Sequence, residues 1–268
     1  MKYLVIKCGG SVLEKLPALF FRDIIQLQQG GEWQPIIVHG GGPLISTLLT
    51  KLGIPTKFVN GLRVTTEEVL DIVEMVLSGS VNKQIVRQIT KQGGRAYGIS
   101  GVDGGLLQTT PVHNADEIGF VGNVCNVNKT MIEEIVKSEY IPVISPVGMD
   151  LEGQRYNVNG DMAAAAIASS LQATLCMVSD IPGIYTVVEG KQQLLNQATQ
   201  TDIENMISQE IIKGGMIPKV RSAIDALTAN VPEVVILNGV DTSSLIDFTL
   251  GKEIGTKILL NKESHYAS

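Results

Sequence analysis

The sequence is short of cysteine, of long apolar runs and of positive charge, and each shortage excludes a class of protein. Its three cysteines, Cys8, Cys125 and Cys176, lie far apart and show no CxxC or Cys/His ligand spacing. Because their number is odd, one thiol stays outside any disulfide pairing. Such cysteine usage is typical of a reducing compartment, so we expect a cytoplasmic protein.

Long apolar runs are missing as well. No stretch approaches the roughly eighteen uncharged apolar residues that a membrane span needs. The opening run, MKYLVIKCGG, is interrupted by Lys7 and therefore lacks the apolar centre of a secretory leader. We expect neither a membrane span nor a leader in this sequence.

Positive charge is in the minority. The formal net charge is -6 and the pI is about 5.2. Nucleic acids and anionic membranes would repel such a protein as a whole, so we expect neither as a partner. Any anion that the protein binds must be held locally.

The residues that are abundant indicate a folded globular protein. The composition combines 44% apolar residues with 18% charged residues and 28 glycines, which is typical of a compact chain with many tight turns. The length of 268 residues allows either one large α/β domain or two smaller ones.

Short apolar runs rich in Val and Ile alternate with helical stretches along the chain. The runs are KYLVIK, PIIVHG, YIPVISP, ATLCMVS and EVVILN, and the helical stretches include residues 16–29, 42–52 and 159–171. Nearly continuous apolar runs are typical of parallel strands that are covered by helices on both faces. We predict an α/β fold, a three-layer αβα sandwich around an open, mainly parallel central sheet.

No linker divides the chain into independent domains. Residues 94–127 contain shorter alternating pieces that we interpret as hairpins forming a flap or rim. We therefore predict a single domain over residues 1–268 with one continuous sheet and two lobes, 1–172 and 173–268.

Ligands bind beyond the carboxyl ends of the strands in open parallel sheets, so the residues after each strand are the first candidates. Lys7, Gly9 and Gly10 follow the first strand, and the glycines allow backbone amides to approach a phosphate. A tight turn with a solvated lysine is the alternative.

His39, Gly40, Gly41, Gly42 and Pro43 follow the second strand. Three consecutive glycines can present their amides to an oxyanion or a carboxylate, although the P-loop and GxGxxG patterns are both absent. His39 is either a base or, as is more common at a strand end, a structural residue.

Two further places carry candidate polar groups. Asn157 and Asn159 precede a helix whose first turn contains Asp161, which either caps that helix or holds lysines in position. Lys213 leads into a later helix that contains Lys219, so that Lys7 and Lys219 can flank a triphosphate from two sides.

Arg63, in the segment NGLRVTTEE, is the remaining candidate. Its guanidinium can clamp a carboxylate with two parallel hydrogen bonds, which suits the α-carboxylate of an amino acid. A surface pair with Glu67 or Glu68 is the alternative.

These segments together resemble one known family. The blocks KCGGSV, VHGGGP, NGLRVT, SGSVNK, ISGVDGG, NVNGDMAA, VSDIPGIY and GGMIPKV occur in this order over nearly the whole chain. They resemble the acetylglutamate kinases of the amino acid kinase superfamily. The ordered set is far more specific than any single block.

The resemblance implies a role for each matching position. Lys7 and Lys219 would stabilise the transferring phosphoryl group, and Asp161 would organise both lysines. The residues implied to bind the acylated amino acid are Gly41, Gly42, Arg63 and Asn157. The residues implied to bind the nucleotide are Gly9, Gly10, Asp180, Ile181, Pro182, Gly183, Ile184, Tyr185, Ile211, Ile212 and Lys213.

The resemblance also implies the reaction. The cosubstrate would be ATP, with Mg²⁺ carried mainly on its phosphates rather than in a protein cage. Residues 1–172 would bind the acyl amino acid and form the dimer contact, and residues 173–268 would bind the nucleotide. The expected product is the acyl phosphate of N-acetyl-L-glutamate, within arginine biosynthesis.

Two kinds of alternative stay open. Another carboxylate or carbamate kinase would differ only in its acceptor, and acetylated aminoadipate has one additional methylene. A catalytically silent sensor of nucleotide or amino acid belongs to a different class.

Arginine-regulated members of the family have an additional amino-terminal helix, whereas the first strand here is expected at about residue 2. The resemblance thus implies a homodimer without arginine feedback.

Overall fold

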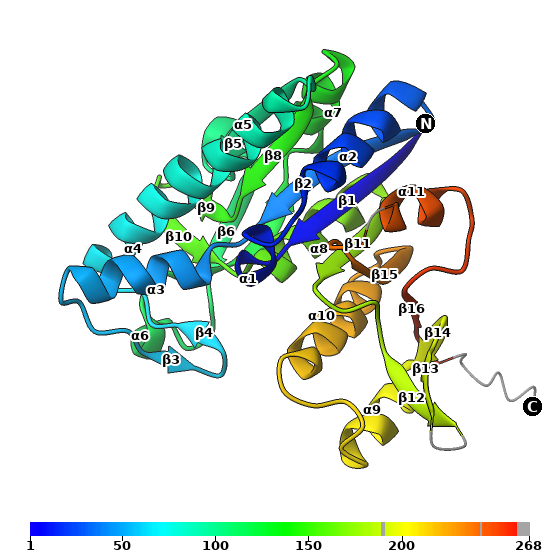
Figure 1. Ribbon diagram of the computed structural model, residues 1–268. Helices are drawn as coiled ribbons and strands as arrows, with labels where there is room; N and C mark the ends of the chain where they lie inside the picture. Colours follow the sequence, from blue (N-terminus) through cyan, green and yellow to red (C-terminus); the bar gives the residue numbers. More distant parts are fainter. Residues whose placement is uncertain (189–190, 242, 262–268) are drawn as a thin grey trace, which may run out of the picture.

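The computed structural model describes residues 1–188, 191–241 and 243–261. They form a central sheet of eight strands with helices on both faces (Figure 1). All neighbouring strands are parallel except the pair β15–β16. The predicted α/β fold with a mainly parallel central sheet is therefore confirmed. In spatial order the strands are β14 (Gln197–Thr199), β16 (Thr256–Leu259), β15 (Glu233–Asn238), β11 (Thr174–Ser179), β1 (Lys2–Cys8), β2 (Trp33–His39), β8 (Ile141–Ser145) and β5 (Ala96–Ser100).

The two faces of this sheet are covered by two hydrophobic cores. Successive side chains of a strand point to opposite faces. Leu4 and Ile6 therefore pack in one core, whereas Val5 packs in the other. The first core contains residues of α2 (Ala18–Gly30), α3 (Gly42–Lys51), α4 (Glu67–Glu74), α5 (Asn82–Lys91) and α11 (Ser244–Thr249). The second contains residues of α7 (Lys129–Lys137), α8 (Gly160–Leu171), α9 (Gln200–Ser208) and α10 (Met216–Thr228).

Helix α8 lies close to the sheet because its buried face is rich in alanine. Ala163, Ala164 and Ala168 are fully buried. The helix starts with a side-chain cap, since Asn159 Oδ1 accepts hydrogen bonds from the backbone N–H groups of Asp161 (2.8 Å) and Met162 (3.3 Å). This cap fixes the first turn of α8, and with it Asp161, above the carboxyl end of β1.

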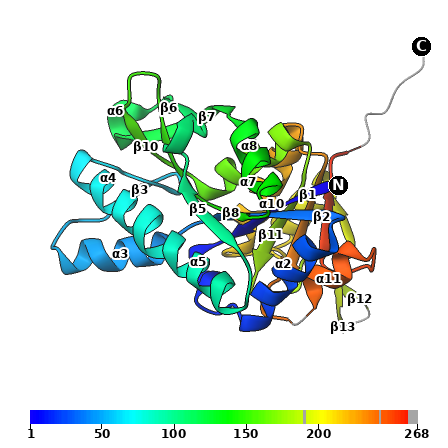
Figure 2. The same cartoon turned by 90° about the horizontal axis from the view of Figure 1, so that it is seen from above.

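A second sheet of four strands was not predicted. Strands β6 (Leu107–Pro111), β7 (Val121–Val127), β9 (Val147–Met149) and β10 (Arg155–Val158) form a small closed barrel, and Figure 2 shows β6, β7 and β10 together with α6 (Ala115–Ile118). The prediction of hairpins within residues 94–127 is right for β6 and β7, which pair antiparallel.

The same prediction is wrong for β5, which is the parallel edge strand of the central sheet beside β8. Its sequence, AYGIS, has only two buried residues, Ile99 and Ser100, at its end. The run is too short and too mixed to show that it joins the main sheet.

The remaining elements are short, apart from one long helix. Helices α4 and α5 are joined by the π-helical segment η1 (Met75–Val81) into one rod. Ser78 in this segment shares a 2.8 Å hydrogen bond with Ser145 at the end of β8. The other elements are α1 (Gly10–Leu13), the 3-10 turn η2 (Asp103–Gly105), and the hairpins β3 (Phe58–Val59) with β4 (Leu62–Arg63) and β12 (Tyr185–Val188) with β13 (Lys191–Leu194).

In the described part of the chain, no helix combines the length and the apolar character that crossing a membrane would require.

Candidate active site

The loops that follow β1 and β2 pack against each other through glycine. A Cβ on Gly10 would lie 2.9 Å from Pro43 Cδ and 3.0 Å from Gly41 Cα. A Cβ on Gly41 would lie 2.7 Å from Leu77 Cδ2. These distances are shorter than a carbon contact allows, so Gly10 needs to be glycine for the two loops to approach, and Gly41 needs to be glycine to pack against Leu77 in the segment 75–81. The backbone of both loops is thereby brought to one point at the carboxyl edge of the sheet.

A cavity of about 320 Å³ opens at this point, where the arrow of β1 ends beside α1 (Figure 1). Gly9, Gly10 and the loop Gly40–Gly42 form part of its wall. Lys7, Asp161 and Lys219 also line it. The two lysines, which are far apart in the sequence, therefore face one space.

Lys7 and Asp161 form a close ion pair within this cavity. Lys7 Nζ lies 2.7 Å from Asp161 Oδ1, and the two side chains are only 14% and 22% exposed. The pair is shielded from most of the solvent, so its attraction is stronger than that of a surface pair.

Lys219 is held differently. Its Nζ donates a 2.7 Å hydrogen bond to Ser179 Oγ and lies 4.0 Å from Asp180 Oδ1. Asp180 Oδ2 is in turn 2.8 Å from Lys15 Nζ. Asp161, which was predicted to organise both lysines, is in direct contact with Lys7 alone.

Burial lowers the pKa of Lys219, and the nearby ammonium groups of Lys7 and Lys15 lower it further. Asp180 and Asp161 act in the opposite direction. Three cations and two carboxylates are therefore close enough to influence one another at this edge of the sheet.

A second, smaller cavity of about 160 Å³ adjoins the first. Its lining includes all four residues predicted to bind the acylated amino acid, Gly41, Gly42, Arg63 and Asn157. The Asn157 side chain donates a 3.1 Å hydrogen bond to Thr65 Oγ1. The structure thus brings together residues from the β2 loop, the β3–β4 hairpin and β10.

Arg63 is buried, and only some of its hydrogen-bond donors have partners. Its Nη2 donates to the Gly42 carbonyl (3.1 Å) and to Ser46 Oγ (2.9 Å), and its guanidinium lies 4.7 Å from the centre of the Phe58 ring. Its buried Nη1 has no hydrogen-bond partner among the described residues. Burial also lowers the pKa of Arg63. A buried donor without an acceptor is costly, which favours an anionic or carbonyl ligand at this point.

A comparison with protein-family models gives one match over most of the chain. Residues 2–238 match the model described as the amino acid kinase family. The chain belongs to the amino acid kinase family.

Relatives within and around the family agree with this assignment. An acetylglutamate kinase of Oceanobacillus iheyensis is 46% identical over 265 residues, which cover 99% of this chain and 100% of the relative. The solved structure of smu.665 from Streptococcus mutans UA159 has a TM-score of 0.79 at 30% identity and covers 96% of this chain and 98% of that one.

A more distant structure shares the fold alone. Carbamate kinase from Giardia lamblia bound to AMP-PNP has a TM-score of 0.66 at 14% identity, with 97% of this chain and 99% of that one covered. The kinase assignment of this chain rests on the family match and on the acetylglutamate kinases that are 46% identical to it.

The residues predicted to contact the nucleotide are less closely grouped than the predicted catalytic residues or the residues predicted to bind the acylated amino acid. Gly9 and Gly10 line the 320 Å³ cavity, and Asp180 lies beside it through its contact with Lys219. Neither cavity is lined by residues 181–185 or 211–213.

The side chains of these two segments differ in exposure. Ile184 and Ile212 belong to one hydrophobic core and are 2% and 4% exposed. Ile181, Ile211 and Lys213 are exposed, while Pro182 and Tyr185 are partly buried. Gly183 is buried, and its backbone places it against Thr256. The roles of these segments stay predictions.

His39 and Cys8 are buried beside the cavities and serve the structure. Burial lowers the pKa of His39 to about 4, so the ring is neutral at neutral pH. Its Nδ1 bonds to the Gly40 carbonyl, and its Nε2 accepts from Asn82 Nδ2. Burial raises the pKa of the Cys8 thiol to about 12, which leaves no thiolate to act as a nucleophile.

Sequence reasoning missed Ser179 and Lys15. Ser179 is the last residue of β11, so the rule that directs attention to strand ends applies to it as well. Lys15 lies beyond α1 and carries no motif of its own. Only the folded chain shows that it contacts Asp180.

Proposed function

We propose that this chain transfers the γ-phosphoryl group of ATP to the γ-carboxylate of N-acetyl-L-glutamate, a step of arginine biosynthesis. The observation that carries the proposal is a shared wall between the two cavities, formed by Gly40–Gly42 together with Asn159 and Gly160. A ligand held by Arg63 on one side of this wall is adjacent to the lysines on the other. Relatives that are 46% identical over nearly the whole chain are named acetylglutamate kinases.

The smaller cavity suits the acylated amino acid. Arg63 Nη1 is a buried donor that needs an acceptor, and a carboxylate oxygen supplies one. Asn157 keeps its carbonyl oxygen for a donor such as the acylated N–H, since its amide nitrogen is bound to Thr65. Apolar residues, among them Ile45, Leu77 and Val158, also line this cavity, which suits an acetyl methyl group.

The larger cavity suits the transferring phosphoryl group. A γ-carboxylate oxygen forms a bond to the γ-phosphorus while the bond from that phosphorus to the β,γ-bridging oxygen breaks, giving an acyl phosphate and ADP. Lys7 and Lys219 stabilise the charge on the moving oxygens. The carboxylate is ionised at neutral pH, so no proton is removed and no general base is needed.

The nucleotide is proposed to lie between Gly9, Gly10 and the segments 180–185 and 211–213. For Mg²⁺, the nearest carboxylates of the site are Asp161 and Asp180, and each already faces a lysine. The described residues contain no group of three His, Cys, Asp or Glu side chains arranged for a metal ion. We therefore propose that Mg²⁺ is held mainly by the nucleotide phosphates.

We further propose a cytoplasmic homodimer with lobes divided near residue 172. Residues 1–172 carry the acyl amino acid cavity, and residues 173–268 carry Lys219 and the two proposed nucleotide segments. Light scattering tests the oligomer, because a hexamer or a monomer in dilute solution contradicts the proposal.

A substrate panel tests the function. ADP release is measured with ATP and Mg²⁺ and, in separate reactions, N-acetylglutamate, N-acetylaminoadipate, glutamate, aspartate and carbamate. We expect N-acetylglutamate to give the highest kcat/KM. Higher activity with another acceptor replaces the proposed substrate, and ATP binding without turnover of any acceptor indicates a sensor.

A further inference from the structure

The hydroxyl of Ser179 is the direct partner of the Lys219 ammonium, at 2.7 Å. Ser179 is fully buried, and its backbone is held against the neighbouring strand β15. It pairs with Asn238 in the neighbouring strand, and its carbonyl accepts a 2.9 Å hydrogen bond from Gly239 N–H. Its hydroxyl oxygen also accepts a 3.4 Å hydrogen bond from Ile181 N–H, which holds in place the acceptor of the flexible lysine side chain.

The two lysines of the cavity are held by groups of different charge. Lys7 is paired with a carboxylate, Asp161, at 2.7 Å. Lys219 is bonded to a neutral hydroxyl, and Asp180 Oδ1 is 4.0 Å away in a carboxylate whose other oxygen, Oδ2, is paired with Lys15. A carboxylate in contact cancels most of the field of an ammonium group, whereas a hydroxyl leaves most of it in place.

We propose that Ser179 is a positioning residue for Lys219, which it orients through a neutral acceptor so that the positive charge stays available to the transferring phosphoryl group. This inference rests on the proposed phosphotransfer function. Electrostatic stabilisation requires donors that are oriented before the reaction, and a lysine without a fixed partner has many rotamers.

The arrangement also keeps each lysine with its holder inside one lobe. Lys7 and Asp161 both belong to residues 1–172, and Ser179 and Lys219 both belong to residues 173–268. A relative movement of the two lobes therefore changes the distance between the lysines without breaking either contact. If Asp161 held Lys219 instead, that contact would cross the boundary between the lobes, and a lobe movement would break it.

Three substitutions at Ser179 test whether Lys219 needs an acceptor at this position and whether that acceptor must be neutral. Ser179→Ala removes the acceptor, and we expect kcat to fall about tenfold with little change in either KM. Ser179→Thr keeps the hydroxyl and retains most of the activity. Ser179→Asp keeps an acceptor but adds a negative charge, and we expect its kcat to fall below that of Ser179→Ala.

Ser145→Ala is the matched control. Ser145 is also the last residue of a central strand, is fully buried, and shares a hydrogen bond with a serine hydroxyl rather than with a cation. We expect it to lower the unfolding temperature about as much as Ser179→Ala does, while kcat stays unchanged. A kcat of Ser179→Ala equal to that of the wild type overturns the proposal, and so does an equal loss in Ser145→Ala.

A measurement without turnover makes the test independent of the acceptor. In a ¹H–¹⁵N spectrum of lysine ammonium groups, Lys219 should give a signal that is slow to exchange in the wild type and is lost in Ser179→Ala. Lys219→Ala identifies the signal. A Lys219 signal that persists in Ser179→Ala overturns the positioning role.

Steady-state kinetics then distinguish a failure of the proposed function from a failure of the Ser179 role. If the wild type prefers another acceptor in the substrate panel, the proposed function fails, and the Ser179 series is measured with that acceptor. In the Lys219→Ala background, Ser179→Ala should have no further effect on kcat, because its role acts through that lysine. A full tenfold effect in both backgrounds contradicts the inference alone.

Discussion

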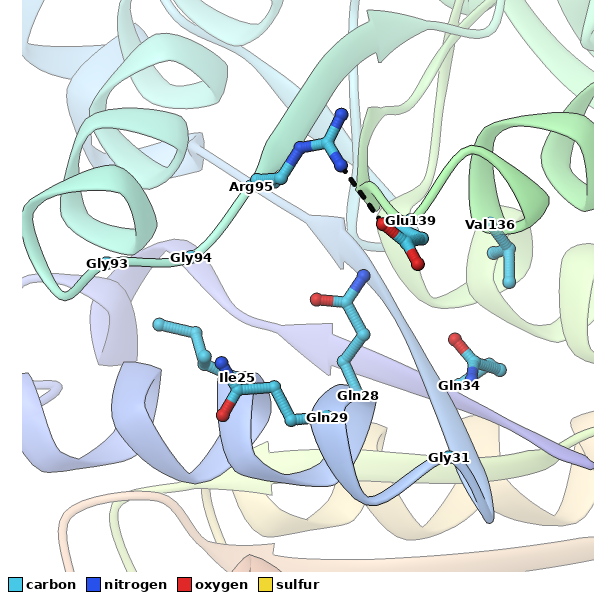
Figure 3. A pocket seen from close by; sticks show the side chains of 10 residues that line it. All are labelled: Ile25, Gln28, Gln29, Gly31, Gln34, Gly93, Gly94, Arg95, Val136 and Glu139. Atoms are coloured by element: carbon cyan, nitrogen blue, oxygen red, sulfur yellow. Dashed lines mark hydrogen bonds and ion pairs between the residues drawn. The ribbon is translucent and has the colours of Figure 1, made fainter.

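The two edges of the central sheet carry cavities that differ in size and in lining. The cavity at the amino ends of β2, β5 and β8 has a volume of about 470 Å³, compared with about 320 Å³ for the one at the carboxyl ends of β1 and β2. Figure 3 shows the larger cavity, whose polar lining consists of the amides of Gln28, Gln29 and Gln34 and the ion pair of Arg95 with Glu139.

The two edges differ in whether their cationic side chains are paired with an anion. Arg95 is bound to Glu139 at 3.3 Å and stacks on Tyr140, so its charge is already matched. At the carboxyl edge, Lys219 is bonded to a hydroxyl and Arg63 keeps a buried donor without a partner. Cavity volume alone would direct attention to the amino edge, whereas unmatched cations and glycine backbone favour the proposed site at the carboxyl edge.

The largest expected contrast between the edges concerns single cations. Lys7→Ala should lower kcat by about a hundredfold or more, as does the loss of one electrostatic donor in other enzymes. Arg95→Ala, at the amino edge, should leave kcat unchanged. Steady-state kinetics on both variants, with thermal unfolding to check the fold, provide the measurement. Equal losses in the two variants would erase the distinction between the edges.

The next contrast concerns glycine. Gly10→Ala should lower kcat/KM by about tenfold to a hundredfold, because its methyl group would push the β1 loop away from Pro43 and Gly41 and misplace the reacting groups. Gly30→Ala is the control near the amino edge, since a Cβ there meets nothing within 4 Å. An active Gly10→Ala variant would show that the two loops can separate without harm.

A smaller effect is expected within the acyl amino acid cavity. Arg63→Lys keeps the positive charge but loses the planar fork, so the KM for N-acetylglutamate should rise about tenfold while the KM for ATP stays the same. Initial rates with one substrate varied at a time separate these values. A parallel rise in both KM values would show that the substitution disturbs the shared wall rather than the carboxylate contact.

The smallest effect concerns pH and the buried His39. Its pKa is lowered from 6.5 to about 4, so between these values the unfolded chain binds a proton that the folded chain does not. This contribution to stability is fully present above pH 6.5 and is lost as the pH falls toward 4. The unfolding temperature of the wild type should therefore drop more over this window than that of His39→Gln. Equal slopes would mean that His39 becomes protonated in the folded protein.

The sequence allowed the prediction of those features that depend on neighbours along the chain. The strand runs, the capped start of α8 and the glycine loops after β1 and β2 are local, and the rule for strand ends directed attention to Lys7 and Asp161. Lys219 was also predicted, although it lies within α10 rather than after a strand. Contacts between distant segments were not predictable in the same way. Nothing in AYGIS indicates that β5 extends the central sheet, and the rotation of α10 that turns Lys219 toward Ser179 rather than Asp161 depends on packing.

The position of β1 in the sheet also bears on how the protein is made. Residues 2–8 pair on one side with β2, which follows soon after, and on the other with β11 at residues 174–179. A ribosome therefore produces about two thirds of the chain before the first strand can gain its second neighbour. Such long-range pairing slows folding and leaves a strand edge open in the meantime. We expect nascent chains that end before residue 174 to depend on chaperones and to lack nucleotide binding.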